Sequence, residues 1–151
     1  KATGIKLKEA TDLPALGLQL TDLILPALWP LVRVCISFLW IWTGIVSLFF
    51  FSQEQSFDWL RAVGLPERLL LPALVASSVI DILLGVLLFS RLRSLSYGIQ
   101  LITVLFYTIV LTFALPDMWL HPFGPASKNL PLLALTALAW IFDRRKYVSL
   151  S

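Results

Sequence analysis

The stretch LLPALVASSVIDILLGVLLF, residues 70–89, decides the fold class of this chain. Its length matches the ~20 apolar residues that an α-helix needs to cross a hydrocarbon layer of about 30 Å. Because backbone N–H and C=O groups find no water inside a bilayer, such a segment is expected to be helical. Asp81 is its one ionisable residue. The stretch therefore predicts a membrane-spanning helix with a carboxyl group near its middle.

Three further apolar segments accompany this stretch. LVRVCISFLWIWTGIVSLFFF covers residues 31–51, LSYGIQLITVLFYTIVLTFAL covers residues 95–115, and PASKNLPLLALTALAWIF covers residues 125–142. The first two have spanning length, whereas the last is shorter and carries Lys128 and Asn129 in its first turn. We therefore predict an all-α fold, an integral membrane bundle of four transmembrane helices that occupies residues 31–146.

The composition excludes several classes of protein. Of the 151 residues, 58% are hydrophobic and 14% are charged, and the mean hydropathy is +0.86. A soluble domain averages about 45–50% apolar and about 25% charged residues, so the apolar surplus must face lipid. An ordinary globular enzyme, a disordered chain and a disulfide-stapled secreted domain are excluded. With Cys35 and His121 as the single residues of their types, neither an internal disulfide nor a multi-histidine metal site is expected.

The remaining regions are connections and ends. Residues 1–30 are predicted to be a soluble and interfacial approach segment, because residues 13–29 are apolar but are interrupted by proline, glycine and aspartate. Residues 52–69 contain FDWLRAVGLP, which predicts a short interfacial helix that ends at Gly64. Residues 147–151 form a tail.

The basic side chains predict the orientation in the membrane. Those on one face are Lys1, Lys6, Lys8, Arg33, Arg91, Arg93, Arg144, Arg145 and Lys146, and those on the other are Arg61, Arg68 and Lys128. By the positive-inside rule, nine against three places both termini in the cytoplasm, as in a multi-pass protein of the bacterial inner membrane. The basic residues behind the formal net charge of +3 are thus explained by orientation in the bilayer, and no nucleic-acid partner is expected.

Asp81 is the first candidate for a ligand-binding residue. A carboxylate at mid-membrane costs about 2.5–3.5 kcal/mol on insertion scales, so this side chain is expected to face the bundle interior. Ser77, Asp81 and Gly85 follow one another on one helix face. This stripe is either a packing face or a ligand or proton site, and both interpretations stay open. We predict a hydrogen bond from Asp81 to Tyr107, to a serine of a neighbouring helix, or to both.

Further candidates lie on the two neighbouring segments. Arg33 and Trp40 share one face of the segment at residues 31–51, and Gln100 and Tyr107 share one face of the segment at residues 95–115. Arg33 either reaches toward Asp81, directly or through Gln100, or extends to the cytoplasmic headgroups. Trp40 and Tyr107 are placed to flank a ligand ring.

The connection WLHPFGPASKN, residues 119–129, is the densest polar and aromatic cluster. Lys128 and Asn129 at a helix N-terminus could hold an anionic or carbonyl headgroup, and His121 could titrate near neutral pH. The alternative is a rigid loop in which Trp119 lies in the interfacial aromatic belt and His121 caps backbone groups.

Three stretches resemble the DoxX-like family of small four-helix membrane proteins. They are RVCISFLWIWTG, GLPERLLLPALVASSVIDILLGVLL and FYTIVLTFALPDMWLHPFGPASKNLPLLAL, and the resemblance covers about residues 29–142. It implies a link to quinone-coupled oxidation of sulfur compounds and to membrane oxidoreductase complexes. The chain is similar to a branch often fused behind a cytoplasmic NAD(P)-binding Rossmann domain, and TDLILPALWPLVR resembles the entry from that domain. No glycine-rich nucleotide fingerprint occurs in this sequence.

These observations support a leading hypothesis and two others. The leading hypothesis is an accessory or quinone- or lipid-binding subunit of a membrane redox system, with the ligand held among Arg33, Trp40, Asp81 and Tyr107. The alternative is a ligand-free membrane anchor or assembly partner for a cytoplasmic NAD(P)-binding oxidoreductase, in which the interior polar groups satisfy one another. A transporter or headgroup-modifying enzyme at residues 119–129 is less favoured, because the chain has no internal repeat. Whether the chain is itself an enzyme stays open, and a homo-oligomer is a further expectation.

Overall fold

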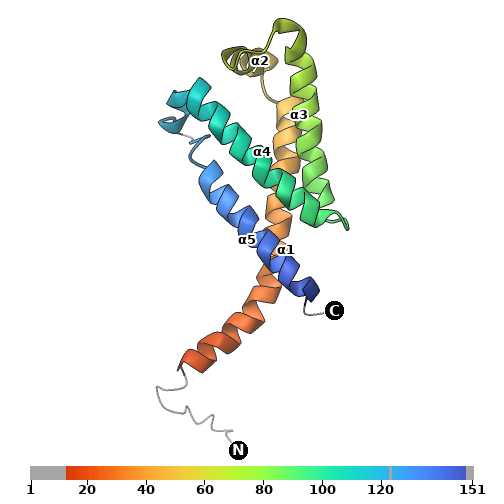
Figure 1. The fold of residues 1–151 in the computed structure, drawn as a ribbon, viewed down its shortest axis with the longest axis vertical. Helices are drawn as coiled ribbons and strands as arrows, with labels where there is room; N and C mark the ends of the chain where they lie inside the picture. The colour runs from red at the N-terminus through yellow and green to blue at the C-terminus, as the bar shows by residue number, and fades with distance from the viewer. Residues whose placement is uncertain (1–12, 123, 149–151) are drawn as a thin grey trace, which may run out of the picture. The chain divides into compact units, whose positions relative to one another are not determined.

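The computed structural model describes residues 13–122 and 124–148, and all of its regular structure there is helical (Figure 1). The helices are α1 (Leu13–Phe49), α2 (Gln53–Ala62), α3 (Glu67–Leu87), α4 (Arg93–Ala114), the 3-10 helix η2 (Pro116–Trp119) and α5 (Asn129–Val148). The chain divides into two compact units, residues 1–32 and residues 33–151. The candidate sites all lie in the second unit.

Three of the described helical segments are long and apolar enough to cross a membrane. They are Leu28–Phe49, Glu67–Leu87 and Arg93–Ala114. The all-α prediction is therefore confirmed for this part of the chain. α5 begins at Asn129 rather than at Pro125, and the charged run that starts at Asp143 falls within it. The fourth span and the cytoplasmic location of both termini stay predictions.

α1 extends further toward the N-terminus than the sequence predicts. The expected span starts at residue 31, whereas the helix starts at Leu13 and continues through Pro26 and Pro30. Pro14 falls in the first turn, where a backbone N–H has no intrahelical partner in any case. Because of these two interior prolines, the sequence pattern predicts an interrupted segment. Each proline removes only its own backbone hydrogen bond, and the backbone groups of the neighbouring turns still bond within the helix.

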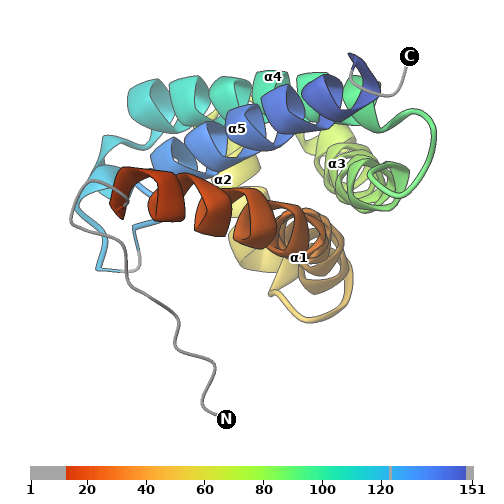
Figure 2. The same ribbon diagram turned by 90° about the horizontal axis from the view of Figure 1, so that it is seen from below.

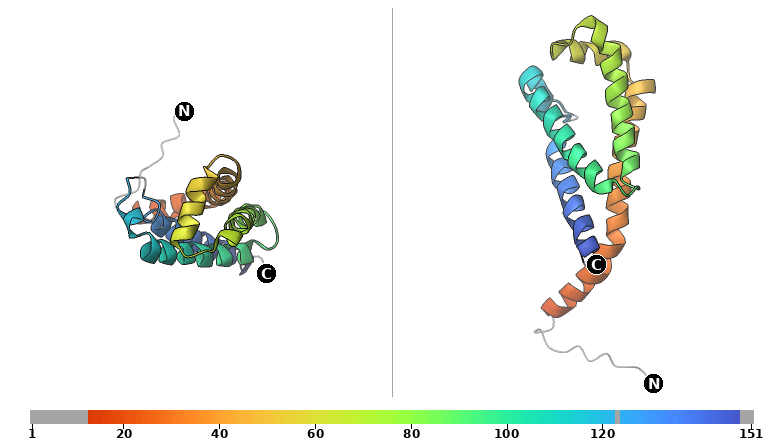
Figure 3. Two further views of the ribbon diagram at one scale, coloured as in Figure 1. Left: turned by 90° about the horizontal axis from the view of Figure 1, so that it is seen from above. Right: turned by 45° about the vertical axis from the view of Figure 1, so that its right-hand side comes forward.

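The short helix expected between residues 52 and 69 is α2. It ends at Ala62, and Gly64 then adopts a φ of 88°, a left-handed conformation that favours glycine. The chain turns back at this point into α3, so that α2 lies at the end of α3 (Figure 3).

Small residues bring α3 against the part of α1 that follows Val32 (Figure 2). The Ser37 hydroxyl donates a hydrogen bond of 2.8 Å to the Gly85 carbonyl. A Cβ atom added at Gly44 would lie 2.5 Å from the Ser78 carbonyl oxygen, and one added at Gly85 would lie 2.8 Å from the Ser37 carbonyl oxygen. This α1–α3 seam therefore requires glycine at both positions, as is typical of closely packed membrane helices.

α4 and α5 form an antiparallel pair that lies side by side in both perpendicular views (Figures 1 and 2). Near one end, the Trp140 indole Nε1 donates to the Ser94 hydroxyl at 2.9 Å. Near the other, the Asn129 amide Nδ2 donates to the Thr108 hydroxyl at 3.0 Å. These side-chain bonds set the register of the pair along its length.

Large apolar side chains cover the outward faces of the spanning helices. Phe38 is 62% exposed, Leu83 is 53% exposed and Ile102 is 69% exposed. A water-soluble protein rarely shows apolar surface of this extent, whereas lipid tails solvate it.

Candidate functional site

A buried carboxylate meets two partly exposed arginines at the end of the helices where α3 turns into α4. Asp143 of α5 is 4% exposed and accepts a hydrogen bond of 2.5 Å from Arg33 Nη2 of α1. Arg93 Nε of α4 lies 3.8 Å from the other carboxylate oxygen, and the Tyr97 hydroxyl interacts with both Arg33 and Asp143. We call Arg33, Arg93, Tyr97 and Asp143 the ion-pair cluster. It ties three helices together.

Arg33 thus has a partner that the sequence interpretation missed. Neither of the two expected arrangements, a reach toward Asp81 or an extension to the headgroups, describes its bond to Asp143. Asp143 directly precedes the basic residues of the C-terminal end and is not among the predicted site residues. A signal was present, because Asp143 is the single acidic residue after Pro125 and stands at the end of an apolar run.

Gln100 is fully buried and binds the last turn of α3. Its Nε2 donates to the Leu84 carbonyl at 3.0 Å and to the Ser96 hydroxyl at 3.2 Å. The Ser96 hydroxyl donates to the same carbonyl at 2.7 Å. Carbonyls in the last turn of a helix lack intrahelical partners, so these side chains complete the end of α3. Gln100 faces the interior, but it does not relay Arg33 to Asp81.

Asp81 faces the interior, as predicted, and is 6% exposed. The predicted hydrogen bond to Tyr107 or to a serine is wrong: Asp81 Oδ1 is buried without any hydrogen-bond partner in the described part of the chain. Tyr107 is nevertheless close enough to interact with Asp81 electrostatically. Trp40 is 4% exposed, and its Nε1 also lacks a partner there.

The connection before α5 is anchored on the last turns of α4. Trp119 Nε1 donates to the Thr112 hydroxyl at 3.1 Å, and Asn129 Nδ2 donates to the Thr108 hydroxyl at 3.0 Å. Two of the candidate residues therefore already have partners within the protein. This arrangement favours the rigid-loop interpretation for Trp119 and Asn129.

A partly open pocket of about 360 Å³ lies between α1, α2 and α3. It is lined by Trp42, Thr43, Val46, Ser47, Phe51, Ser56, Trp59, Leu60, Leu74 and Ser77. Three aromatic rings form much of its wall, and the Phe51 and Trp59 ring centroids are 5.3 Å apart. No charged side chain lines it. The pocket therefore suits a neutral, partly apolar molecule.

Two of the lining hydroxyls donate their protons to backbone carbonyls of their own helices. Thr43 Oγ1 donates to the Leu39 carbonyl at 2.8 Å, and Ser77 Oγ donates to the Leu74 carbonyl at 3.0 Å. Each such hydroxyl is satisfied within its own helix and still presents lone pairs to the pocket.

None of the predicted site residues lines this pocket. His121 and Lys128 are exposed in the connection that precedes α5. The sequence did contain a signal for the pocket. Ser47 lies on the same helix face as Arg33 and Trp40, and Ser77 begins the stripe that includes Asp81.

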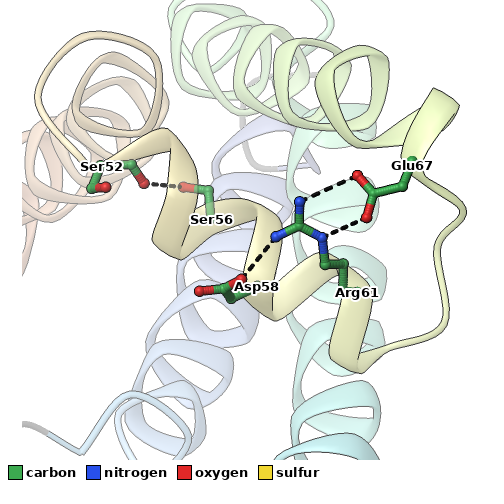
Figure 4. A network of polar contacts seen from close by, with 5 residues as sticks. All are labelled: Ser52, Ser56, Asp58, Arg61 and Glu67. Carbon is green, nitrogen blue, oxygen red and sulfur yellow. Dashed lines mark hydrogen bonds and ion pairs between the residues drawn. The ribbon is translucent and has the colours of Figure 1, made fainter.

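The wall formed by α2 is held to α3 by an arginine (Figure 4). Arg61 Nε and Nη2 donate to the two carboxylate oxygens of Glu67 at 2.7 and 3.2 Å, and Nη1 donates to Asp58 Oδ1 at 2.8 Å. The bonds to Glu67, the largest cause, and to Asp58 raise the pKa of Arg61 above its usual range. Ser56, one turn after Ser52, donates to the Ser52 carbonyl at 3.2 Å and faces the pocket. The position of α2 thus depends on exposed ion pairs.

Comparison of the sequence with protein-family profiles gave a match. A profile of the DoxX-like family matches residues 37–137, about two thirds of the chain. The chain belongs to the DoxX-like family. With its three long apolar helices, this DoxX-like protein is an integral membrane protein. Comparisons with curated proteins and with solved structures gave no significant match.

The matched range contains every residue that lines the pocket, whereas Arg33 and Asp143 lie outside it. Across the described ranges, no group of three or more His, Cys, Asp or Glu side chains is arranged to hold a metal ion.

Proposed function

We propose that this DoxX-like protein binds a quinone, or a lipid-soluble molecule of similar chemistry, between α1, α2 and α3, as an accessory subunit of a membrane redox system. The observation that carries the proposal is the uncharged pocket of about 360 Å³ with its aromatic wall. Small-molecule sites are typically clefts of about 300–1,000 Å³, mostly apolar and with a few polar groups that set orientation.

The lining residues fit a quinone head group. A quinone has a flat apolar ring and carbonyl oxygens that accept hydrogen bonds, and when bound it supplies electron and proton transfer. Trp42, Phe51 and Trp59 offer ring faces and edges for offset contacts. The Ser47 hydroxyl can rotate to donate to a ligand carbonyl, whereas Ser77, which donates to the Leu74 carbonyl, presents its lone pairs to the pocket. The lipid-exposed side of Trp42 leaves room for an apolar tail to enter the bilayer.

The test is a binding titration with a short-tailed ubiquinone analogue. Purified protein in detergent is expected to show saturable quenching of tryptophan fluorescence, because Trp42 and Trp59 line the pocket. Ser77→Leu fills the pocket and is expected to weaken binding about tenfold, which corresponds to ~1.4 kcal/mol.

The matched control is Val75→Leu, on the same helix but 42% exposed toward lipid, which should leave binding unchanged. Quenching without saturation, or equal affinity in Ser77→Leu and the parent protein, would contradict the proposal.

The ion-pair cluster favours a second candidate function, a ligand-free anchor or assembly partner for a cytoplasmic NAD(P)-binding oxidoreductase. In such a protein the interior polar groups serve packing, as Arg33 and Asp143 do. Chemical crosslinking in native membranes of the producing organism separates the two functions. An anchor keeps its crosslinked partner in the Ser77→Leu variant, and the redox activity of those membranes is unchanged by that substitution.

A further inference from the structure

Outside the ion-pair cluster, four buried side-chain polar atoms have no hydrogen-bond partner within the described residues, and each belongs to a different helix. They are Trp40 Nε1 of α1, Asp81 Oδ1 of α3, Gln100 Oε1 of α4 and Thr136 Oγ1 of α5. The residues are 4%, 6%, 0% and 1% exposed, respectively. Buried polar atoms almost always have a partner, because leaving one unsatisfied is costly. Four of them on four helices point to a shared occupant.

The α1–α3 seam places Trp40 and Asp81 at the same depth. Ser37 of α1 donates to the Gly85 carbonyl of α3 at 2.8 Å. Trp40 lies one turn beyond Ser37, and Asp81 lies one turn before Gly85, on helices that run in opposite directions. Both side chains therefore leave the seam at the same level.

The third atom, Gln100 Oε1, lies at nearly the same depth as Asp81. Gln100 Nε2 binds the Leu84 carbonyl at 3.0 Å, and Leu84 is one turn from Asp81 on α3. The free Oε1 of Gln100 therefore lies within one helical turn of the level of Asp81.

Thr136 is placed by the ion pair. Arg33 and Asp143 are bonded to each other, and each has a buried polar residue two turns away on the same helix face: Trp40 follows Arg33 on α1, and Thr136 precedes Asp143 on α5. Two turns correspond to about 10 Å of helix rise, so Trp40 and Thr136 share one depth above the ion pair.

We propose that Trp40, Asp81, Gln100 and Thr136 bind internal water at the centre of the helix bundle, at what we call the axial water site. Trp40 Nε1 can only donate, Gln100 Oε1 can only accept, and the Thr136 hydroxyl can do both. A buried water makes about three hydrogen bonds and is both donor and acceptor, so it satisfies such a mixed set. A bare cation fits less well, because the indole N–H offers it no lone pair.

Water at this site would hydrate the Asp81 carboxyl group inside the membrane. Ser77, which lines the pocket, is one turn from Asp81 on the same face of α3. A hydrated Asp81 is therefore placed to exchange a proton with a molecule in the pocket, and this consequence alone rests on the proposed function. The titratable group facing Asp81 from α4 is Tyr107, and the charged groups of the ion-pair cluster lie about two turns away.

Nuclear magnetic resonance on ligand-free protein with ¹⁵N-labelled tryptophan tests the site directly. The indole proton of Trp40, assigned by its loss in Trp40→Phe, is expected to show a nuclear Overhauser contact to water. Thr136→Val should weaken this contact at least about twofold, since it removes one of the site's polar groups. An indole proton of Trp40 without any water contact would overturn the proposal.

Thermal unfolding of Thr136→Val in detergent is the second measurement, and it keeps the proposal testable if the spectra are poor. Loss of a hydroxyl that binds water should lower the Tm, whereas loss of a dry, unpartnered hydroxyl should raise it. The control is Thr43→Val, whose hydroxyl is on an exposed face and bonds its own helix at 2.8 Å. A Tm that rises or stays constant in Thr136→Val overturns the axial water site. Both measurements need no quinone, so their failure is distinct from failure of the binding titration.

Discussion

The two ends of the helices use the same ion-pair chemistry in different surroundings. At one end, the Asp143 side chain is 5% exposed and binds Arg33, whose side chain is 21% exposed. At the other end, Arg61 binds Asp58 and Glu67, whose side chains are 67% and 72% exposed. Removing one partner of a buried pair leaves an uncompensated charge, whereas water replaces a lost partner at the surface. We therefore expect the buried pair to contribute more to the stability of the bundle than the exposed pairs that position α2.

The pocket lies at the end of the helices that carries the exposed ion pairs. Its α2 wall carries Ser56, Trp59 and Leu60, and α2 is held to α3 by the exposed Arg61 network. Under the proposed function, weak exposed ion pairs would let the α2 wall move to admit a ligand from the bilayer, whereas the ion-pair cluster keeps the other helix ends together. The following substitutions test this division.

Asp143→Asn should produce the largest loss of stability. It leaves the Arg33 guanidinium against a neutral amide, and breaking a buried pair costs about 3–5 kcal/mol. Since Arg33 is partly exposed, the lower end of that range is expected. Chemical unfolding in detergent measures the loss. The control is Asp58→Asn at the exposed pair. Equal destabilisation by the two substitutions would contradict the conclusion that the buried pair contributes more to stability.

Gly44→Ala should come next. Its Cβ would meet the Ser78 carbonyl oxygen at 2.5 Å, and a backbone atom cannot move aside as a flexible side chain can. Overpacking of this kind costs about 1–3 kcal/mol, read as a lower Tm. Gly98→Ala is the control, because the nearest atom to its added Cβ is a Trp140 ring carbon at 3.6 Å, an ordinary contact. If Gly98→Ala lowers the Tm as much, close packing at the seam is not the cause.

Asn129→Leu should have a smaller effect, at the pocket end of the α4–α5 pair. It removes the bond of 3.0 Å to the Thr108 hydroxyl, and such bonds between membrane helices average about 0.6 kcal/mol. A double-mutant cycle with Thr108→Val in chemical unfolding isolates that term. A coupling energy above about 2 kcal/mol would show that Asn129 does more than join two helices.

Arg61→Gln should change the Tm least. Its partners are exposed, so the fold is expected to persist, but a looser α2 wall should weaken binding of the ubiquinone analogue a few-fold. Arg68→Gln, an exposed arginine on the first turn of α3, serves as the control and should leave both quantities unchanged. A Tm loss as large as that of Asp143→Asn would contradict the assignment of the exposed network to positioning rather than stability.

Much of the fold was predictable from local properties of the sequence. Helix formation and spanning length depend on apolar content over about 20 residues, and segments at residues 31–51, 70–89 and 95–115 contain this information within themselves. The inward direction of Asp81 was predictable for the same reason, because lipid excludes a carboxyl group whatever the neighbouring helices are. The unbroken helix at residues 13–30 was not predictable, since its prolines oppose the apolar pattern.

The partners of the polar side chains were decided by tertiary structure alone. Arg33 and Asp143 are 110 residues apart, and the pocket draws its wall from three helices. Sequence spacing determines which residues share a helix face, so the stripes containing Ser47 and Ser77 were visible. It contains no information on how each helix rotates and slides against the next. That rotation and depth, set by the fit of Gly44 and Gly85 into the α1–α3 seam, decide which polar groups meet and where a pocket is left between the helices.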